Sequence, residues 1–261
     1  MILEIFKDSL KYAFENKKSV FIIGILSLFI FLIIPIVFIS GYLYRIVEIG
    51  LEGMINTEML IATDKDLEFN NFKGMLIEGL KLIAITFIYS LIPILITNLF
   101  ISSYNFIISN ARGDILLNIS LEIFLIILIT GIIGFILINV AIPHMIKNES
   151  LKSGFKIKEL IRIIKSVGIV EYILYTFASL IVLFSVSIIS FLLIQLLTSI
   201  LSSVLGLVAI TSDWILMGIH YDLILYGLLM ILIVFPLYLI FQTRAMALLY
   251  ETNDLEEFED E

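Results

Sequence analysis

The stretch FKIKELIRIIKSVG, residues 155–168, determines how the rest of the chain is interpreted. On a helix, its apolar residues recur every three or four positions and share one face. These residues are Ile157, Leu160, Ile161, Ile164 and Val167. The remaining face carries Lys156, Lys158, Glu159, Arg162 and Lys165. An apolar stripe backed by Lys and Arg is typical of a helix that lies in the headgroup layer of a bilayer. We therefore predict that this stretch marks a membrane surface.

The composition of the chain is that of a membrane protein. Of 261 residues, 61% are hydrophobic and only 15% are charged, whereas soluble domains carry about 25% charged residues. Several apolar runs exceed the roughly 20 residues that span a hydrocarbon core. The sequence thus predicts an all-α, polytopic transmembrane helical bundle in the cell membrane, with residues 1–250 as a single domain.

The net charge of −8 comes almost entirely from the C-terminal end. Seven of the last eleven residues are acidic, and we expect 251–261 to be a disordered, solvated tail. No other part of the chain is basic enough to suggest a nucleic-acid partner. The chain contains no cysteine, which excludes disulfides, thiolate chemistry and Cys-based metal sites.

Residues 2–15 repeat the pattern of the opening stretch, because Ile2, Phe6, Leu10 and Ala13 fall on one helical face. A signal peptide is the competing interpretation. However, this segment carries acidic residues, and no small-x-small cleavage site follows the apolar run after it. An interfacial helix is therefore favoured.

The number of spans depends on residues 19–53. The run from Ser19 to Gly41 could be one span. Alternatively, the chain turns near Ile34 and Pro35, with Pro35 in the first turn of a returning helix. Further spans are predicted at 82–108, 116–146, 168–197 and 215–248, with a short amphipathic helix at 72–81 and a kink at Pro236.

The distribution of Lys and Arg favours the hairpin. Five spans would put five and eleven of these residues on the two sides, whereas six spans would put one and fifteen. Because cytoplasmic loops carry the excess of positive residues, we predict six spans with both termini cytoplasmic. The first arm is short: sixteen residues from 19 to 34 reach about 24 Å, against a core of about 30 Å. We expect a hairpin that is shallow or that thins the bilayer.

This topology divides the chain into three possible units, each an interfacial helix followed by two spans: 2–53, 72–146 and 155–250. Parallel internal repeats do occur in membrane proteins. The pattern is also easily produced in a chain rich in Ile and Leu, so a true repeat remains one of two alternatives.

Four pieces of the chain together resemble a largely archaeal membrane family, domain of unknown function 4013. They are GYLYRIVEIGLEG (41–53), FNNFKGMLIEGLKLI (69–83), FKIKELIRIIKSVG (155–168) and FQTRAMALLYE (241–251). The family shows a Gly-Tyr followed by a positive residue and a glycine, a Gly-Leu-Lys entering a span, a Phe-led basic helix and a final Arg before Leu-Tyr. Loop 54–68 departs from the family, which often has a Leu-Pro-acidic turn there. The resemblance implies a multi-span membrane protein and brings no known activity or catalytic residues.

Two groups of charged residues are candidate sites. The first would bind anionic headgroups at the cytoplasmic surface and consists of Lys152, Lys156, Lys158, Arg162 and Lys165. The second lies near the cytoplasmic ends of spans and consists of Arg45, Glu48, Glu171 and Arg244. Its members either extend to the interface or form a polar cluster that joins three spans or lines a cavity.

No metal, cofactor or catalytic site is predicted. The two histidines, His144 and His220, lack a metal-binding spacing and are expected to be ordinary interfacial residues. Asp213, His220 and Asp222 could share a helical face, but the ends of spans attract such residues in any case. Three deeper amides are expected to form interhelical hydrogen bonds: Asn98, Asn139 and Gln195.

Three functions are compared. The leading hypothesis is a non-enzymatic integral membrane protein that acts on lipid, bilayer organisation or a membrane partner. The second is a small transporter or permease subunit, which would need a hydrated path, although polar groups near mid-membrane are few. The third is an intramembrane enzyme. No Gly-rich phosphate loop, G-x-S-x-G elbow or paired-carboxylate motif supports it.

Overall fold

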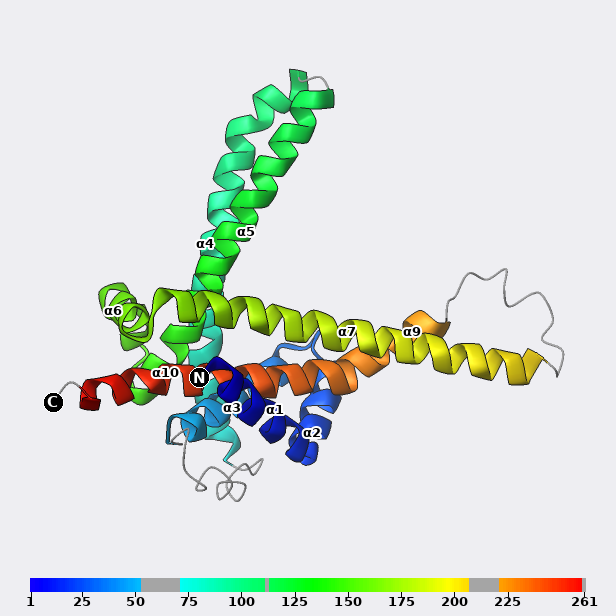
Figure 1. The fold of residues 1–261 in the computed structure, drawn as a ribbon, viewed down its shortest axis with the longest axis horizontal. Helices are drawn as coiled ribbons and strands as arrows, with labels where there is room; N and C mark the ends of the chain where they lie inside the picture. The colour runs from blue at the N-terminus through cyan, green and yellow to red at the C-terminus, as the bar shows by residue number, and fades with distance from the viewer. Residues whose placement is uncertain (53–70, 111–112, 207–220, 260–261) are drawn as a thin grey trace.

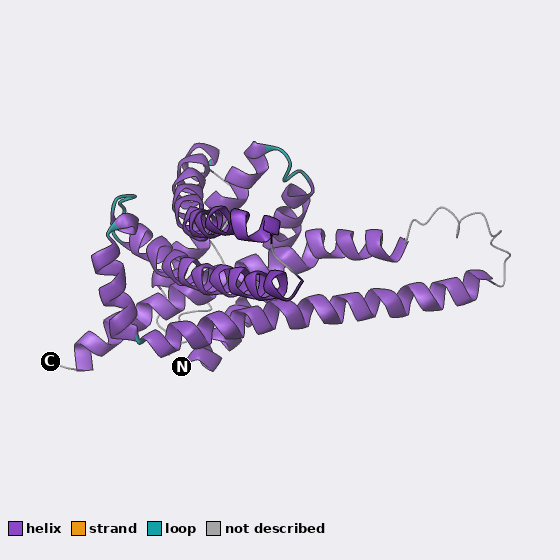
Figure 2. Ribbon diagram, turned by 90° about the horizontal axis from the view of Figure 1, so that it is seen from above, coloured by secondary structure: helices purple, strands orange, loops and turns teal. Residues whose placement is uncertain are grey.

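The structure is a computed structural model, and it describes residues 1–52, 71–110, 113–206 and 221–259. Within these ranges every regular element is a helix (Figure 2), which confirms the all-α class. The α-helices are α1 (Ile2–Glu15), α2 (Lys17–Leu28), α3 (Ile33–Glu52), α4 (Phe72–Asn110), α5 (Gly113–Lys147), α6 (Ile157–Val167), α7 (Ile169–Gly206), α9 (Tyr221–Leu229) and α10 (Phe235–Glu259). A 3₁₀ turn, η2 (Ser153–Phe155), precedes α6, and a π-helical segment, η3 (Met230–Val234), joins α9 to α10.

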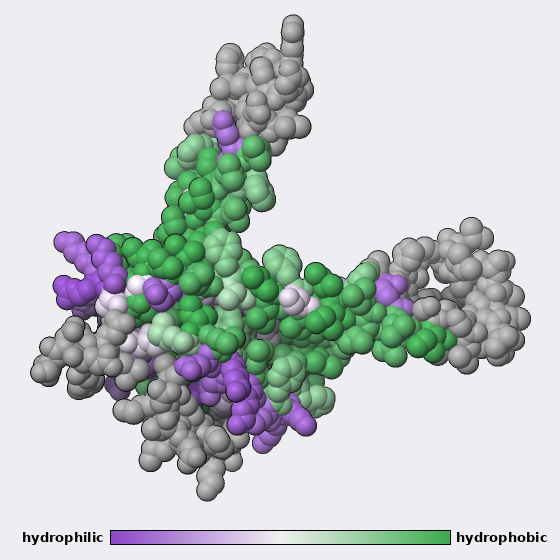
Figure 3. All heavy atoms as spheres, viewed as in Figure 1, coloured by the Kyte–Doolittle hydropathy of each residue, from purple (hydrophilic) through white to green (hydrophobic). Residues whose placement is uncertain are grey.

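Five helical segments are long and apolar enough to cross a membrane. They are Ile33–Leu51, Phe72–Ser102, Leu121–Lys147, Ile169–Leu197 and Ile224–Thr252. Large hydrophobic side chains are exposed along most of these segments, and Figure 3 shows an apolar surface over both projecting arms. Contiguous exposed apolar surface of this extent is unfavourable in water. The chain therefore fits a multi-pass integral membrane protein.

The predicted N-terminal hairpin is present, with its turn slightly earlier than expected. Helix α2 ends at Leu28, the chain turns over 29–32, and α3 begins at Ile33 with Pro35 in its first turn. Proline is tolerated there because its missing N–H would have no helical partner. With 12 residues, α2 is only about 18 Å long. Among the described residues, five helical segments rather than six reach spanning length. Helix α2, the first arm of the hairpin, is too short to cross by itself.

Two long arms extend from a shared body (Figure 1). One arm is formed by α4 and α5, and the other by α7 with α9 and η3 beside it. The two views agree that the arms point in different directions. The body lies where α1, α3, α6 and α10 meet the adjoining ends of α4, α5 and α7. Its fully buried side chains include Ile5, Ile46, Met75, Met145, Tyr172 and Phe241.

Helices α3 and α4 approach each other closely at two glycines. A Cβ on Gly41 would clash with the carbonyl oxygen of Met75, and a Cβ on Gly79 would clash with that of Val37. The contact is reciprocal. Met75 precedes Gly79 by four residues on α4, and Val37 precedes Gly41 by four residues on α3. Small residues permit such backbone contacts between membrane helices, and Cα–H···O interactions accompany them.

A second close contact surrounds Pro236, where the sequence predicts a kink. Because proline lacks an N–H, the carbonyl of Leu232, four residues earlier, loses its usual helical partner. The helix adopts the π conformation over Met230–Val234 at this point. Gly24 of α2 packs directly against the Leu232 carbonyl, since a Cβ there would clash with it. The irregular turn is thus covered by a glycine of another helix.

Two predicted boundaries differ from the structure. Residues 72–81 are not a separate surface helix but the first turns of α4, because no proline interrupts the chain before Pro93. By contrast, α6 is separated from α7 by Gly168, whose φ of 110° favours glycine. Helix α10 continues as far as Glu259, and the disorder of 251–261 stays a prediction. At the start of this segment, Glu251 forms an ion pair with Lys147 of α5.

Candidate functional site

Helix α6 is fixed to the body by one face only. Leu160, Ile163 and Val167 are buried, whereas Ile157 and Ile161 are exposed. The apolar face drawn from the sequence is therefore divided: part of it packs on the protein and part remains open. The buried part lies against α5, α7 and α10.

The predicted headgroup-binding residues are all exposed: Lys152, Lys156, Lys158, Arg162 and Lys165. Lys156 Nζ donates to Glu159 Oε1 at 3.0 Å. The other four form no ion pair with any residue that the structure describes. Figure 3 shows hydrophilic surface at the end of the molecule where Figure 1 places α6. We call these five cations, together with Ile157 and Ile161, the α6 surface.

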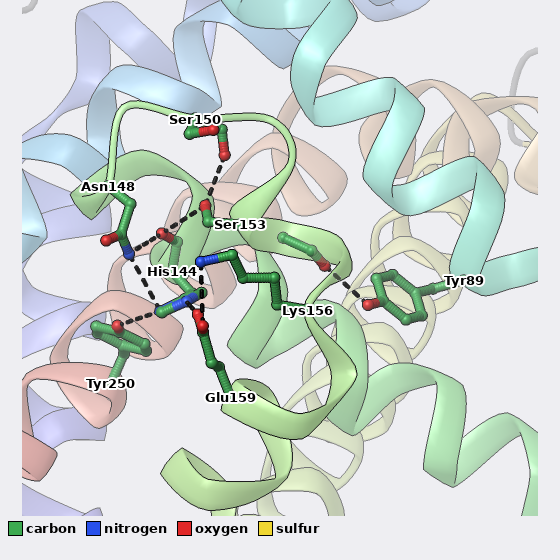
Figure 4. Close-up of polar contacts among 9 residues, drawn as sticks. Tyr89, His144, Asn148, Ser150, Ser153, Lys156, Glu159 and Tyr250 are labelled. Atoms are coloured by element: carbon green, nitrogen blue, oxygen red, sulfur yellow. Dashed lines mark hydrogen bonds and ion pairs between the residues drawn. The ribbon is translucent and has the colours of Figure 1, made fainter.

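A polar network around His144 holds α6 in place (Figure 4). His144 Nδ1 lies 2.8 Å from the hydroxyl of Tyr250, and His144 Nε2 lies 3.2 Å from Glu159 Oε2. The three residues come from α5, α10 and α6, respectively. One imidazole thus links the ends of three helices.

The carboxylate of Glu159 is stabilised in its charged form. The hydrogen bond from Lys156 lowers the pKa of Glu159, and the bond to His144 lowers it further. Glu159 also lies in the first turn of α6, where the helix dipole favours negative charge. The N-terminal end of α6 is therefore held on the body by charge-assisted contacts.

The loop between α5 and α6 is tied down by further hydrogen bonds. Asn148 Nδ2 donates to the carbonyl of His144 at 2.8 Å, and Ser153 Oγ donates to the carbonyl of Ser150 at 2.6 Å. The hydroxyl of Tyr89, on α4, donates to the carbonyl of Gly154 at 2.8 Å. These bonds fix the direction in which α6 leaves the body.

A hydroxyl, an imidazole and a carboxylate in a chain are also the parts of a catalytic triad. Here the imidazole and the hydroxyl are buried: His144 is 8% exposed and Tyr250 is 4% exposed. The contacts of these two side chains link α5 with α10 and α6. The sequence did not indicate this network, because Glu159 lies 15 residues and Tyr250 lies 106 residues from His144.

The two arginines of the second predicted group take part in separate ion pairs. Arg45 Nε donates to Glu78 Oε2 at 2.9 Å, between α3 and α4. Arg244 Nε donates to Asp8 Oδ2 at 3.3 Å, between α10 and α1. Arg244 is only 1% exposed, so it does not extend to solvent. Its guanidinium lies 5.0 Å from the ring centroid of Tyr12.

The two acids of that group come from different helices. Glu48 is on α3, one turn after Arg45. The carboxylate of Glu171, at the start of α7, lies against Gly168. Within the described part of the chain, no ion pair links Glu171 to either arginine. Two partners of the arginines, Asp8 and Glu78, were not in the predicted group.

The deeper amides have different outcomes. Asn139 on α5 bonds to Tyr175 of α7 and Gln242 of α10, which confirms an interhelical role. The prediction for Asn98 is wrong, because its Nδ2 donates to the carbonyl of Ile94 in its own helix. Gln195 lies on α7.

No cluster of three or more potential metal ligands occurs among the described residues. Asp213 and His220 lie outside those residues, and of Asp222 only the backbone, in α9, is described. The expectation that these three hold no metal stays a prediction.

Comparison with known protein families identifies the family of this chain. A family model described as "Protein of unknown function (DUF4013)" matches residues 25–195. The chain belongs to this family. The matched range contains the first three motif pieces, whereas FQTRAMALLYE (241–251) lies beyond it. No curated protein and no solved structure matches the chain. In this DUF4013 protein, the motif glycines Gly41 and Gly79 are the ones that meet between α3 and α4.

Proposed function

We propose that this DUF4013 protein is a non-enzymatic integral membrane protein that acts on the bilayer through its α6 surface. The observation that carries the proposal is the set of exposed cations beside the exposed side chains of Ile157 and Ile161. Four of these cations have no ion-pair partner in the described part of the chain. The positions of Lys and Arg further support a cytoplasmic location for this surface and for both termini.

The chemistry of the α6 surface fits anionic headgroups. Each Lys or Arg near an anionic leaflet contributes about 1 kcal/mol, and salt screens this attraction. Ile157 and Ile161 would insert at the boundary of the acyl chains, as on other interfacial helices. The opposite face of α6 packs on the body. Lipid bound to α6 therefore influences how the whole protein is oriented in the bilayer.

The proposal is tested by measuring which lipids the full-length protein retains. The protein is reconstituted in vesicles of phosphatidylcholine and phosphatidylglycerol, extracted mildly, and its retained lipids are quantified by mass spectrometry. The wild type should enrich phosphatidylglycerol over the starting mixture, and the enrichment should fall as salt rises. The variant Lys158→Gln/Arg162→Gln/Lys165→Gln should lose most of the enrichment.

The matched control keeps the charge. Lys158→Arg/Lys165→Arg should retain phosphatidylglycerol as the wild type does, since attraction to a surface depends on charge rather than on side-chain identity. An enrichment that is insensitive to both salt and the glutamine variant would overturn the proposal. A soluble protein partner for the α6 surface would then be the better hypothesis.

A further inference from the structure

A cavity of about 290 Å³ lies between α3, α4, α5 and the start of α10. Pockets for small ligands begin near this size. The wall of the cavity is almost wholly apolar and contains no charged side chain. Apolar cavities stay free of water and bind apolar molecules. None of the residues of the α6 surface or of the His144 network lines this cavity.

The cavity is elongated along α10. Its lining residues on this helix begin at Phe235 and end at Met246. Eleven steps of the helix separate these two residues, which is about 16 Å. Ile30 and Phe235, at one end of the lining, are exposed. Leu43 and Met246, at the other end, are only 8% and 5% exposed. The cavity therefore has a mouth near the turn between α2 and α3.

The inner end of the cavity is closed by contacts between helices. Beyond Met246, α10 meets α3, since a Cβ on Gly50 would clash with the Cβ of Ala247. It also meets α5 through the hydrogen bond between Tyr250 and His144. A molecule that enters at the mouth thus ends within the body.

The mouth opens into the apolar surface of the protein. The residues that follow Ile30 in the chain are large and exposed: Phe31, Leu32, Ile33 and Ile34. Ile231 and Ile233 of η3, shortly before Phe235, are also exposed, and they belong to the spanning segment Ile224–Thr252. In a bilayer, such a surface faces hydrocarbon. The mouth is continuous with this surface, so lipid chains are the molecules that meet it.

The polar groups of the lining do not call for a polar ligand. Gln242 Nε2 donates to Asn139 Oδ1 at 3.1 Å and to the hydroxyl of Tyr175 at 2.7 Å. The hydroxyl of Thr243 donates to the carbonyl of Leu239 in its own helix. Gln242 Oε1 has an accessible area below 1 Å², so a ligand does not reach it. A charged headgroup would lose its hydration in the cavity without compensation.

We propose that this cavity holds one hydrocarbon chain of a membrane lipid, inserted with its terminal methyl group toward Leu43 and Met246. The headgroup stays outside, beyond Ile30 and Phe235. The chain supplies the packing contacts that the wall of an empty cavity lacks, and these contacts increase with the volume that is filled. The site is independent of the α6 surface, since the two share no residue.

The test uses photoactivatable phosphatidylcholines and the full-length protein in vesicles of neutral phosphatidylcholine. Two probes carry a diazirine in one acyl chain, either at the terminal carbon or next to the carbonyl. Both should label exposed residues of the spanning segments. Only the terminal diazirine should label Leu43 and Met246, because these residues are too buried for lipid outside the cavity to reach. Mass spectrometry of the labelled peptides locates the sites.

Three variants test whether the chain lies in the cavity. Leu239→Trp and Thr86→Phe fill it from α10 and α4, and each should abolish the labelling of Leu43 and Met246. The control is Ile233→Trp, which adds a ring at an exposed position outside the lining and should preserve this labelling. Thermal unfolding verifies the fold of each variant. The two filling variants lie on different helices, so misfolding of one leaves the other as the test.

Three results would overturn the proposal. In the first, neither probe labels Leu43 or Met246. In the second, both probes label these residues equally, so that the chain has no fixed direction. In the third, their labelling survives in a folded filling variant.

Discussion

Arg45 and Arg244 show how single residues keep positive charge within an apolar body. Each donates to a carboxylate on a neighbouring helix. The side chain of Arg45 is 12% exposed and that of Arg244 is 1% exposed. An arginine in such a position is costly unless it is paired. Both pairs join segments far apart in the sequence, so each pair also holds two helices together.

We predict that Arg45→Ala destabilises the protein markedly. Loss of one partner leaves Glu78 as an unpaired, largely buried charge, and breaking a fully buried pair costs about 3–5 kcal/mol. The control is Lys11→Ala, because Lys11 pairs with Glu15 on the surface and exposed pairs contribute about 0–1 kcal/mol. Thermal unfolding in detergent should show a much larger loss for Arg45→Ala. Equal melting temperatures would indicate that the Arg45 pair is fully hydrated.

Glu159 leads to a prediction about pH. Its pKa is lowered in the folded protein, so its stabilising effect is complete above the pKa of an unfolded glutamate. This effect disappears as the pH falls through the lowered pKa. Glu159→Gln should therefore be less stable than the wild type at neutral pH, and the difference should vanish in acid. Thermal unfolding from neutral pH to pH 3 measures this, with Glu15→Gln as the control. A difference that is constant over this range would contradict it.

At the scale of elements, glycine contacts decide how the helices pack. Gly41 and Gly79 bring α3 and α4 together, and Gly24 brings α2 to the π-helical turn. A Cβ added at any of these glycines would lie 2.0–2.2 Å from a backbone oxygen of the facing segment. Any side chain at these positions would push the helices apart.

Substitution of Gly79 tests this packing. Gly79→Leu should destabilise the protein by at least the 1–3 kcal/mol typical of overpacking, because the clash is with backbone rather than with a movable side chain. Gly131→Leu on α5 is the matched control, since a Cβ at Gly131 meets no atom within 4 Å. Thermal unfolding of the two variants in detergent would contradict the account if they lost stability equally.

The sequence alone predicts the elements better than their contacts. Apolar runs and charge positions are local signals, and they indicate the helix at 2–15, the hairpin before residue 53 and the separate helix after Phe155. The network of His144 with Glu159 and Tyr250 depends on which helix ends meet, which no local pattern encodes. The same holds for the carboxylates that pair with the arginines. Asn139 was predicted correctly because a deep amide needs a partner, whereas exposed Asn98 finds one in its own helix.

At the scale of the whole molecule, the divergence of the two arms has a consequence in a bilayer. Membrane helices tilt by 0–40° from the bilayer normal, whereas the two arms point in clearly different directions (Figure 1). An arm left outside the hydrocarbon would expose its large apolar side chains. The predicted topology puts both arm tips on the same side.

We therefore predict that a bilayer brings the arms closer to parallel. Spin labels are attached at Ser102→Cys on α4 and Ser185→Cys on α7, in a chain without other cysteines. Their distance in vesicles, measured by pulsed electron resonance, should be shorter than the separation in the structure. A distance equal to that in the structure would show that the arms remain apart.

The central claim is that the α6 surface faces the cytoplasm, and labelling of single cysteines in sealed cells tests it most directly. The cysteine-free chain makes every introduced cysteine the only reactive thiol. Under the six-span topology, a membrane-impermeant reagent should label Arg112→Cys from outside but leave Lys158→Cys and Asp64→Cys unlabelled until the cells are opened. Labelling of Lys158→Cys or Asp64→Cys in sealed cells, with Arg112→Cys protected, would contradict the account.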